Sequence, residues 1–447
     1  MSASKGDDAS EGTQDAPVAT LVRAIELAEK KLHRVYACNE TWSESLVVPG
    51  HVSLHGGFDC ASGWAYVAGE SARAMLVSPG RIGMKLVDGA PTVSSFLTDF
   101  HIESADASEP GSSSFGLFVA GEHVPLTVRR CDIYSGNGAP GLKGEDGDTD
   151  GSPAAAGAPG NAGANACSAP VSKGGVGVEN ACEGGISKGG AGGDSGLMTA
   201  ANGSVGEPSA EPPAGEGGLG EQASPACTPG KAGAPGLDGE SGLGGKSWPF
   251  ALLEDDWVPL EWPTDGAPGA PGQGGGGGGA TFGSAAVCGA ANPGGAAGGS
   301  GGAGGCGGKA GKGGMKGGGS FAIAIRSPVR IESTLAVAGN GGDGGDGGLP
   351  QPGGDGGAPG AGGAGMGAVN PGCAGGAGGK GGRGGWGGGG PGGSTVGLLH
   401  VPSAMGWFAD NQSTLVATRS GRGGSGQIGE TIYEGVDGTE ADVLGLP

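Results

Sequence analysis

The clearest helical pattern in the chain lies near its start, where apolar residues recur every three or four positions. This spacing predicts an amphipathic helix beginning after Pro17, a residue suited to a first helical turn, and containing Val18, Leu21, Val22, Ile25, Ala28 and Leu32. A short helix of this kind needs a surface to lie on. Residues 1–16 are polar and acidic, so we expect a disordered leader there.

From the helix to residue 137 the chain alternates short β-prone runs with Gly, Pro, Asn and Asp turn residues. The runs lie at residues 35–37, 45–48, 52–55, 75–77, 84–87, 96–102, 116–119 and 124–133. Short strands at this spacing fit a sandwich, a barrel or a solenoid equally well. Residues 17–137 are therefore predicted to form a capping helix and an all-β unit.

A two-strand segment recurs across long glycine-rich gaps, and this repeat favours the solenoid. The segment beginning at Ser114 matches the one beginning at Ser320, and a weaker copy runs from Ser394 to Gly423. One such rung cannot bury its apolar face alone, so we expect the copies to be neighbours in space. The later rungs are predicted at residues 320–340 and 394–422, with a tail at 423–447, and the glycine tracts should leave from equivalent corners.

Two glycine-rich insertions, at residues 138–319 and 341–393, separate these copies, and in their regular stretches only every third residue is not glycine. Glycine makes up 113 of the 447 residues, too many for ordinary side-chain packing to order the tracts. Collagen fits poorly because the glycine register breaks between Asp148 and Asp150. Two alternatives remain. The tracts are disordered, or they form polyglycine II bundles, in which three-residue-per-turn helices bond through their backbones.

Two groups of residues are candidates for a ligand or partner surface. In a three-residue-per-turn helix, Lys380, Arg383 and Trp386 would share one edge. The segment 247–263 holds three tryptophans, and exposed rings stack on sugars and anchor interfaces. These are Trp248, Trp257 and Trp262. The alternative for this segment is that its rings seal the glycine bundle against the solenoid.

One motif suggests a metal. Asp146, Asp148 and Asp150 match the start of a calcium loop, but Gly157 stands where a bidentate acid is expected. Calcium is therefore a weak candidate, and no other cofactor is predicted. Asp99, His101 and Glu103 alternate along a predicted strand, so they would share one solvated polar face. No catalytic residues are predicted.

Composition narrows the possible roles. Hydrophobic residues are 36% of the chain and aromatic residues 4%, which limits it to one modest apolar core. The formal net charge of -21 argues against a nucleic-acid partner, because phosphate binding draws on clustered Lys and Arg. The sequence also lacks a run of eighteen apolar residues, so no transmembrane segment is predicted.

The nine cysteines indicate disulfides and an oxidising compartment, and we expect a secreted or cell-surface protein. Local pairs would close short loops: Cys38 with Cys60, Cys167 with Cys182, and Cys288 with Cys306. The odd count leaves at least one thiol free or intermolecular. The polar start of the chain carries no export signal, so the export route is left open.

Residues 20–60, TLVRAIELAEKKLHRVYACNETWSESLVVPGHVSLHGGFDC, resemble the opening of right-handed parallel β-helix proteins of the pectinesterase-like kind. The shared features are a capping helix with an Ala-Ile pair, a Glu before an apolar strand, and a Val-x-Leu-x-Gly-Gly rung. With its Phe-Asp-Cys rung and interspersed glycine tracts, the chain resembles secreted glycine-rich PGRS-type proteins of myxobacterial kind. The resemblance implies an architecture and no activity.

These observations together predict a non-catalytic extracellular structural or adhesive protein. We expect its partner to be itself, in filaments or a matrix. A polysaccharide- or partner-binding module is the alternative. An ice-binding protein comes third, since bulky third-position residues disrupt a regular face. A β-helix carbohydrate enzyme comes last, because no second acid stands near Asp99.

Overall fold

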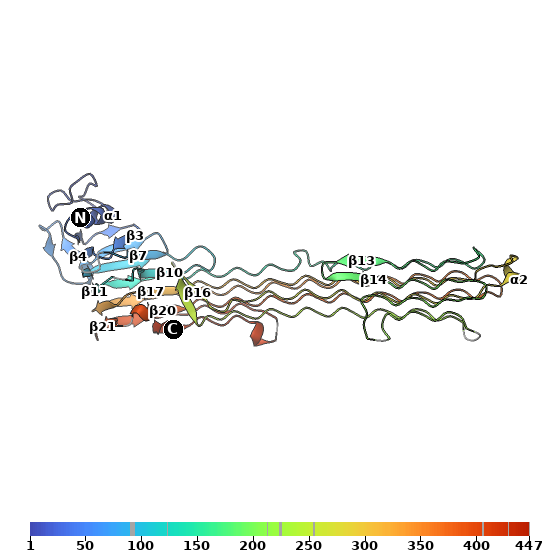
Figure 1. Cartoon of the computed structure of the whole chain (residues 1–447). Coiled ribbons are helices and arrows are strands. Elements are labelled where there is room, and N and C mark those ends of the chain that lie inside the picture. Colours follow the sequence, from blue (N-terminus) through green and yellow to red (C-terminus); the bar gives the residue numbers. More distant parts are fainter. Residues whose placement is uncertain are drawn as a thin grey trace.

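The computed structural model describes residues 1–89, 94–122, 124–211, 213–222, 226–253, 255–404, 406–427 and 429–446. A body of stacked strands lies at one end of the molecule, and a long rod extends from it (Figure 1). The strands outnumber the helices and most of them pair in parallel, so the predicted all-β class is confirmed.

The body consists of three parallel sheets, and the chain visits them in the same order on six successive turns. The first sheet contains β1 (Arg34–Cys38), β4 (Ser53–Asp59), β8 (Ser95–Thr98), β11 (Leu126–Arg129), β18 (Val329–Glu332) and β21 (Phe408–Ala409), with β5 (Ala65–Tyr66) antiparallel to β4. The second contains β2 (Thr41–Trp42), β6 (Ala74–Ser78), β9 (Phe100–Ser104), β12 (Asp132–Tyr134), β19 (Leu335–Val337) and β22 (Thr414–Val416). The third contains β3 (Leu46–Pro49), β7 (Ile82–Val87), β10 (Ser114–Val119), β17 (Ser320–Ile325), β20 (Thr395–His400) and β23 (Glu440–Gly445).

Equivalent side chains of successive turns stack in columns inside the body, because side chains alternate between the two faces of a strand. One column of the first sheet is Val35, Leu54, Leu97, Val128 and Ile331, each the register partner of the next. All five are buried and belong to a single apolar cluster. The modest core expected from composition is therefore concentrated in this body.

Helix α1 (Leu21–Lys30) covers the first turn of the body and confirms the predicted helix. Thr20 caps its start by accepting a hydrogen bond from the Arg23 amide, and the buried face includes Leu21 and Ile25. Leu32 falls outside the helix and is 79% exposed, because the helix ends at residue 30.

The expectation of a disordered leader at residues 1–16 is wrong, because carboxylates and main-chain groups of the body hold this segment. The Ser2 amide donates to the carbonyl of Val18 (3.1 Å), and Ser2 Oγ donates to Glu40 (3.0 Å). The Asp8 carboxylate accepts from the amides of Ala19 and Thr20 (both 2.9 Å).

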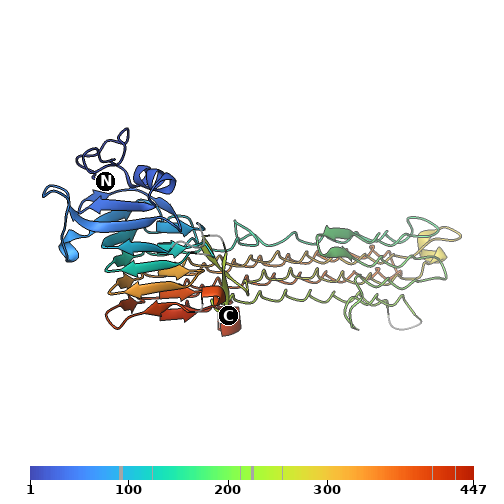
Figure 2. The same cartoon turned by 60° about the vertical axis from the view of Figure 1, so that its left-hand side comes forward.

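The repeated rungs lie next to one another as predicted. Phe115 of β10 pairs with Phe321 of β17, and Phe321 pairs with Val396 of β20. The third rung extends further than predicted, because β23 lies within the expected tail 423–447 and pairs with β20. The three long excursions leave between β12 and β17, between β19 and β20, and between β22 and β23, which is the same corner each time (Figure 2).

Main-chain hydrogen bonds between neighbouring segments order the rod. In the central segment 294–319, three successive residues donate to three different neighbours: Gly298 to Gly193 (3.0 Å), Gly299 to Cys373 (3.0 Å) and Ser300 to Asn161 (2.9 Å). Residues 294–306 are almost entirely buried although they carry no large side chain. The backbone therefore takes the place of an apolar core here.

A few short elements interrupt the rod and the coil of the body. They are the hairpins β13 (Glu179–Cys182) with β14 (Gly185–Lys188) and β15 (Phe250–Leu253) with β16 (Asp256–Pro259), helix α2 (Ala285–Cys288), and the 3-10 turns η1 (Glu70–Ala72), η2 (Pro402–Ala404) and η3 (Thr431–Tyr433).

Four disulfides connect the chain, and only Cys38–Cys60 joins a predicted pair. The expected pairs Cys167–Cys182 and Cys288–Cys306 are wrong, because the rod places distant segments side by side. The bonds in the rod are Cys167–Cys288, Cys182–Cys306 and Cys227–Cys373. Cys131 is the free thiol that the odd count requires, and burial raises its pKa to about 12.

Candidate functional site

The predicted row Lys380, Arg383 and Trp386 lies on the surface of the rod, in segment 371–393. The carbonyls of these residues accept from Gly236, Gly239 and Gly242 (2.8, 2.8 and 2.7 Å), so the row is in register with segment 228–245. The two cations are exposed, whereas Trp386 is half-buried. Lys380 lies 3.2 Å from Asp355 and Arg383 lies 3.8 Å from Asp238, so both cations already face acids of neighbouring segments.

Short polar side chains at third positions have a structural role that the sequence did not reveal. At the outer edge of the rod, several third-position residues have an amide without a main-chain acceptor, and a side-chain oxygen of the adjacent segment accepts its hydrogen bond instead. The pairs include Arg383 with Asp238 (2.7 Å), Arg422 with Asp343 (2.8 Å), Ser425 with Asp346 (2.7 Å) and Leu243 with Thr264 (2.8 Å). Asp343 and Asp346, which belong to the GGDGGDGG stretch at residues 341–348, therefore fasten the edge of the rod.

The calcium candidate is not assembled in the structure. The Asp146 carboxylate accepts from the Leu349 amide (2.7 Å) and pairs with Lys143 (2.6 Å), and Asp148 accepts from the Ser152 amide (2.6 Å). Asp150 is exposed. Within the described part of the chain, no group of three or more His, Cys, Asp or Glu side chains could hold a metal ion. Asp146 and Asp148 act as edge and turn acceptors instead.

Removing the Asp146 acceptor is expected to loosen one edge of the rod. The hydrogen bond from the Leu349 amide, aided by Lys143, lowers the pKa of the Asp146 carboxyl from its ordinary value. Because the folded-state pKa lies below the unfolded one, this stabilisation is complete above the unfolded pKa and is lost as the pH falls through the folded pKa. Asp146→Ala should cost about 1 kcal/mol near neutral pH.

Hydrogen exchange at the Leu349 amide measures this effect directly. Asp146→Asn is the matched control, because its amide oxygen still accepts a hydrogen bond but no longer titrates. We expect Asp146→Asn to retain most of the protection and to lose its acid dependence. Equal protection in the parent and the alanine variant would contradict the role of this carboxylate.

The tryptophan segment forms the β15–β16 hairpin, which packs on the outer face of the third sheet. Trp257 is fully buried in a second apolar cluster with Phe250 of the hairpin, Phe115 of β10 and Phe321 of β17. The expectation that Trp257 contacts a ligand is therefore wrong, because its ring has no exposed surface. Trp248 and Trp262, which flank the hairpin, are 38% and 50% exposed.

Cations of the body and the rod surround this hairpin. Lys85 of β7 pairs with Asp255 (2.5 Å), and Arg326 donates to the Leu252 carbonyl (2.9 Å). Lys316, from the base of the rod, lies over the Trp257 ring at 5.0 Å and near Asp256 at 3.5 Å. Desolvation lowers the pKa of Lys316. The hairpin therefore connects the sheets to the rod.

Trp257→Ala is expected to destabilise the body by about 3–5 kcal/mol, because it removes a fully buried ring from a packed cluster. The measurement is chemical denaturation followed by far-UV circular dichroism. Trp262→Ala is the matched control and should change stability by less than about 0.5 kcal/mol, since half of that ring is exposed. Similar losses in both variants would contradict the assignment of Trp257 as a packing residue.

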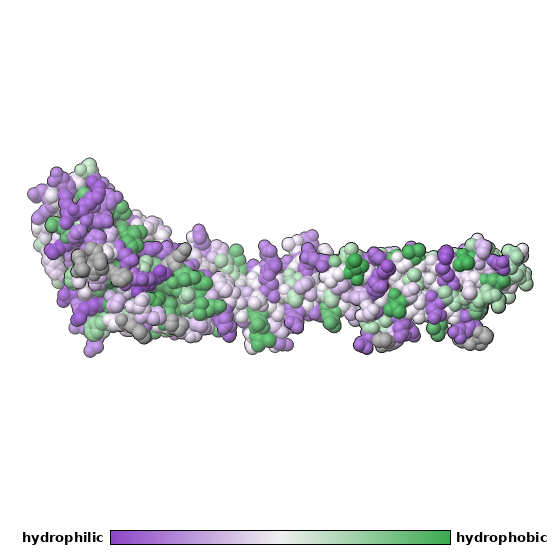
Figure 3. All heavy atoms as spheres, viewed as in Figure 1, coloured by the Kyte–Doolittle hydropathy of each residue, from purple (hydrophilic) through white to green (hydrophobic). Residues whose placement is uncertain are grey.

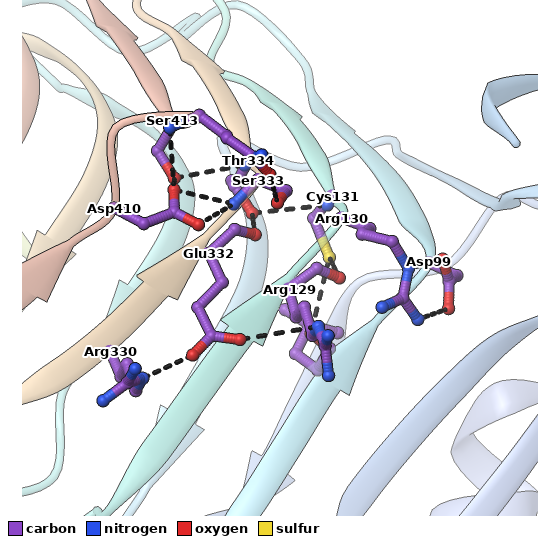
Figure 4. A network of polar contacts seen from close by, with 12 residues as sticks. Asp99, Arg129, Arg130, Cys131, Arg330, Glu332, Ser333, Thr334, Asp410 and Ser413 are labelled. Carbon is purple, nitrogen blue, oxygen red and sulfur yellow. Dashed lines mark hydrogen bonds and ion pairs between the residues drawn. The ribbon is translucent and has the colours of Figure 1, made fainter.

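Polar contacts also line the corner between the first and second sheets (Figure 4). Asp99, Arg130 and Ser333 occupy equivalent corners with φ values of 58°, 50° and 48°. The buried Asp99 carboxylate accepts two hydrogen bonds from Arg130 (2.8 and 2.7 Å). Asp410 of the last turn accepts from the Ser333 amide (3.0 Å). These contacts join successive turns of the coil.

The expected polar face of Asp99, His101 and Glu103 forms only in part. His101 and Glu103 lie on β9 with their side chains 2.7 Å apart. Asp99 is at the corner in a left-handed conformation, which turns its side chain away from that strand face. Its carboxylate is satisfied by Arg130 and by the Tyr66 hydroxyl (3.2 Å).

Apolar and polar residues are interspersed along the visible face of the rod (Figure 3). Exposed apolar side chains of the rod include Leu237 (80% exposed) and Met198 (82%). No helix among the described residues is both long and apolar enough to cross a bilayer. No protein-family model, curated protein or solved structure matches the chain.

Proposed function

We propose that the protein is a non-catalytic extracellular structural or adhesive protein in which a rigid rod projects from a compact body. In this proposal the three sheets are a right-handed parallel β-helix and the rod is a polyglycine II bundle. The architecture resembles that of secreted glycine-rich PGRS-type proteins. The four disulfides suit an oxidising, extracellular type of environment.

One observation carries the proposal: the rod is built from backbone-to-backbone bonds that repeat every three residues. Gly138, Gly141 and Gly144 donate in turn to Asn340, Asp343 and Asp346, each at 2.8 Å. In segments at the surface of the rod, a three-residue repeat leaves one residue in three facing outward. Such a rod is suited to presenting its outward-facing residues at a distance from the body.

Self-association is the favoured partner interaction, and the two ends of the body differ in their capacity for it. Helix α1 and the leader cover the first turn, whereas the last turn ends on β21, β22 and β23 at the edges of their sheets. Unpaired strand edges are templates for pairing with another chain. Contact between bodies would therefore use the last turn, and longer filaments would need contacts along the rods.

The polysaccharide-binding alternative is favoured by one observation, the exposure of Trp248 and Trp262 beside the hairpin. Rings of this kind stack on sugars. Glycan-array binding that is lost in a Trp248→Ala/Trp262→Ala variant would favour this alternative over self-association.

Small-angle X-ray scattering and negative-stain electron microscopy across a concentration series test the proposal. We expect elongated particles with one thick end at low concentration, and dimers or filaments at high concentration. Compact particles would contradict the rod. Elongated particles that stay monomeric at all concentrations would leave the rod in place and contradict self-association.

A further inference from the structure

A cavity of about 340 Å³ lies at the capped end of the body, where the leader, α1 and the first strands meet. Its size falls within the range of small-molecule pockets. None of the surfaces discussed above includes it. Tyr36 and Leu32 line the cavity and are 45% and 79% exposed, so it opens to solvent beside them.

Most of the lining is apolar. Leu27 of α1, Tyr36 of β1, Phe58 of β4 and Trp64 contribute large apolar side chains. Tyr36 and Phe58 meet edge to face with ring centroids 5.4 Å apart. A flat ring or an aliphatic chain of a ligand would therefore contact aromatic and aliphatic side chains on several sides.

A disulfide and hydrogen bonds hold the loop that presents Trp64. Trp64 has a φ of 62°, a left-handed conformation that is unusual for a bulky residue and is often found at functional sites. The Cys38–Cys60 disulfide closes the start of the loop, and the Asp59 carboxylate accepts from the Ala61 amide (2.9 Å). The leader approaches from the other side, where Gln14 Nε2 donates to the Gly63 carbonyl (3.4 Å).

Two cations line the same cavity. Lys31 and Arg34 are both exposed, and neither forms an ion pair with any residue that the structure describes. Glu11 is the only acid among the described residues that line the cavity. This excess of positive charge is local, since the chain as a whole carries a formal net charge of -21. The cavity therefore combines an apolar interior with an electrostatic preference for an anion.

We infer that this cavity binds a small apolar carboxylate, with its ring or acyl chain among Leu27, Tyr36, Phe58 and Trp64 and its carboxylate at Lys31 and Arg34. The inference is independent of the role proposed for the rod. Charge-assisted hydrogen bonds from lysine and arginine to a carboxylate are among the strong polar contacts in proteins. A neutral molecule of the same shape would lose these contacts.

Isothermal titration calorimetry of the full chain with octanoate and with octanol tests the inference. We expect octanoate to bind with one-to-one stoichiometry, and octanol to bind at least about tenfold more weakly, which corresponds to about 1.4 kcal/mol. The Lys31→Met/Arg34→Met variant should lose about tenfold or more in octanoate affinity. Lys30→Met is the matched control, because Lys30 is exposed at the end of α1, next to Lys31, but does not line the cavity.

Trp64→Ala tests the apolar wall separately and should weaken both probes. Its thermal unfolding is measured in parallel, so that loss of binding is counted only where the variant remains folded. The inference is overturned if octanoate does not bind the parent protein, if octanol binds as tightly as octanoate, or if the lysine and arginine substitutions leave the affinity unchanged. If Trp64→Ala unfolds, the charge variants still decide the question.

Discussion

Gly302→Ala is expected to disrupt the centre of the rod, although it adds a single carbon atom. A Cβ at this position would lie 2.2 Å from the Gly357 carbonyl oxygen and 2.6 Å from its carbon. Both are backbone atoms of a neighbouring segment, so the segments must separate to admit the methyl group. The hydrogen bond from the Gly357 amide to the Ala303 carbonyl (2.8 Å), which joins these two segments, would then be lost. We expect a loss of about 3 kcal/mol or more.

Hydrogen exchange resolved by mass spectrometry measures this loss, and the rod peptides should exchange faster than those of the body. Gly184→Ala is the matched control, because the nearest atom to its added Cβ is Pro271 Cδ at 3.5 Å, an ordinary contact. The adjacent Ala303 is fully buried and already carries a Cβ. The cost of adding a Cβ should therefore depend on which of the three edges of the helical segment the residue occupies. Equal exchange in both variants would contradict backbone packing of the rod.

Removing two long-range disulfides of the rod is the second change that we expect to reduce stability strongly. Cys182–Cys306 and Cys227–Cys373 span 124 and 146 residues, and each should stabilise the fold by about 5 kcal/mol through restriction of the unfolded chain. Glycine loses more conformational freedom on ordering than any other residue. A glycine-rich rod therefore depends on these bonds more than the body does. We expect replacement of both pairs by alanine to abolish exchange protection in the rod.

The body provides the control for the disulfide prediction. Cys38–Cys60 spans 22 residues, and its replacement by alanine should cost about 3 kcal/mol and leave the rod unchanged. The measurement is peptide-resolved hydrogen exchange of the three proteins in parallel. Retained protection throughout the rod without these two disulfides would contradict the dependence of the rod on them, with Cys167–Cys288 still in place.

Local patterns anticipated local elements well. The three-to-four spacing after Pro17 gave α1, and the repeat beginning at Ser114 and Ser320 correctly anticipated strands that lie in register. Both predictions depend on side chains that are near in sequence or that recur in copies. Interpretation failed where the partner was distant in the chain. Cys167 was predicted to pair with the nearby Cys182, yet it bonds to Cys288, 121 residues away.

The sequence by itself determined the units of this protein: a capping helix, an apolar rung that recurs, and tracts whose three-residue period excludes side-chain packing. Only the tertiary structure decided which of these units meet. The tertiary structure pairs Cys167 with Cys288 and buries Trp257. It also places Asp99 at a corner between two strands, in a left-handed conformation. The physical reason is that glycine segments carry no side chains to specify their neighbours. Contacts in the rod are therefore set by backbone register, which begins at the corner of the body where each tract leaves.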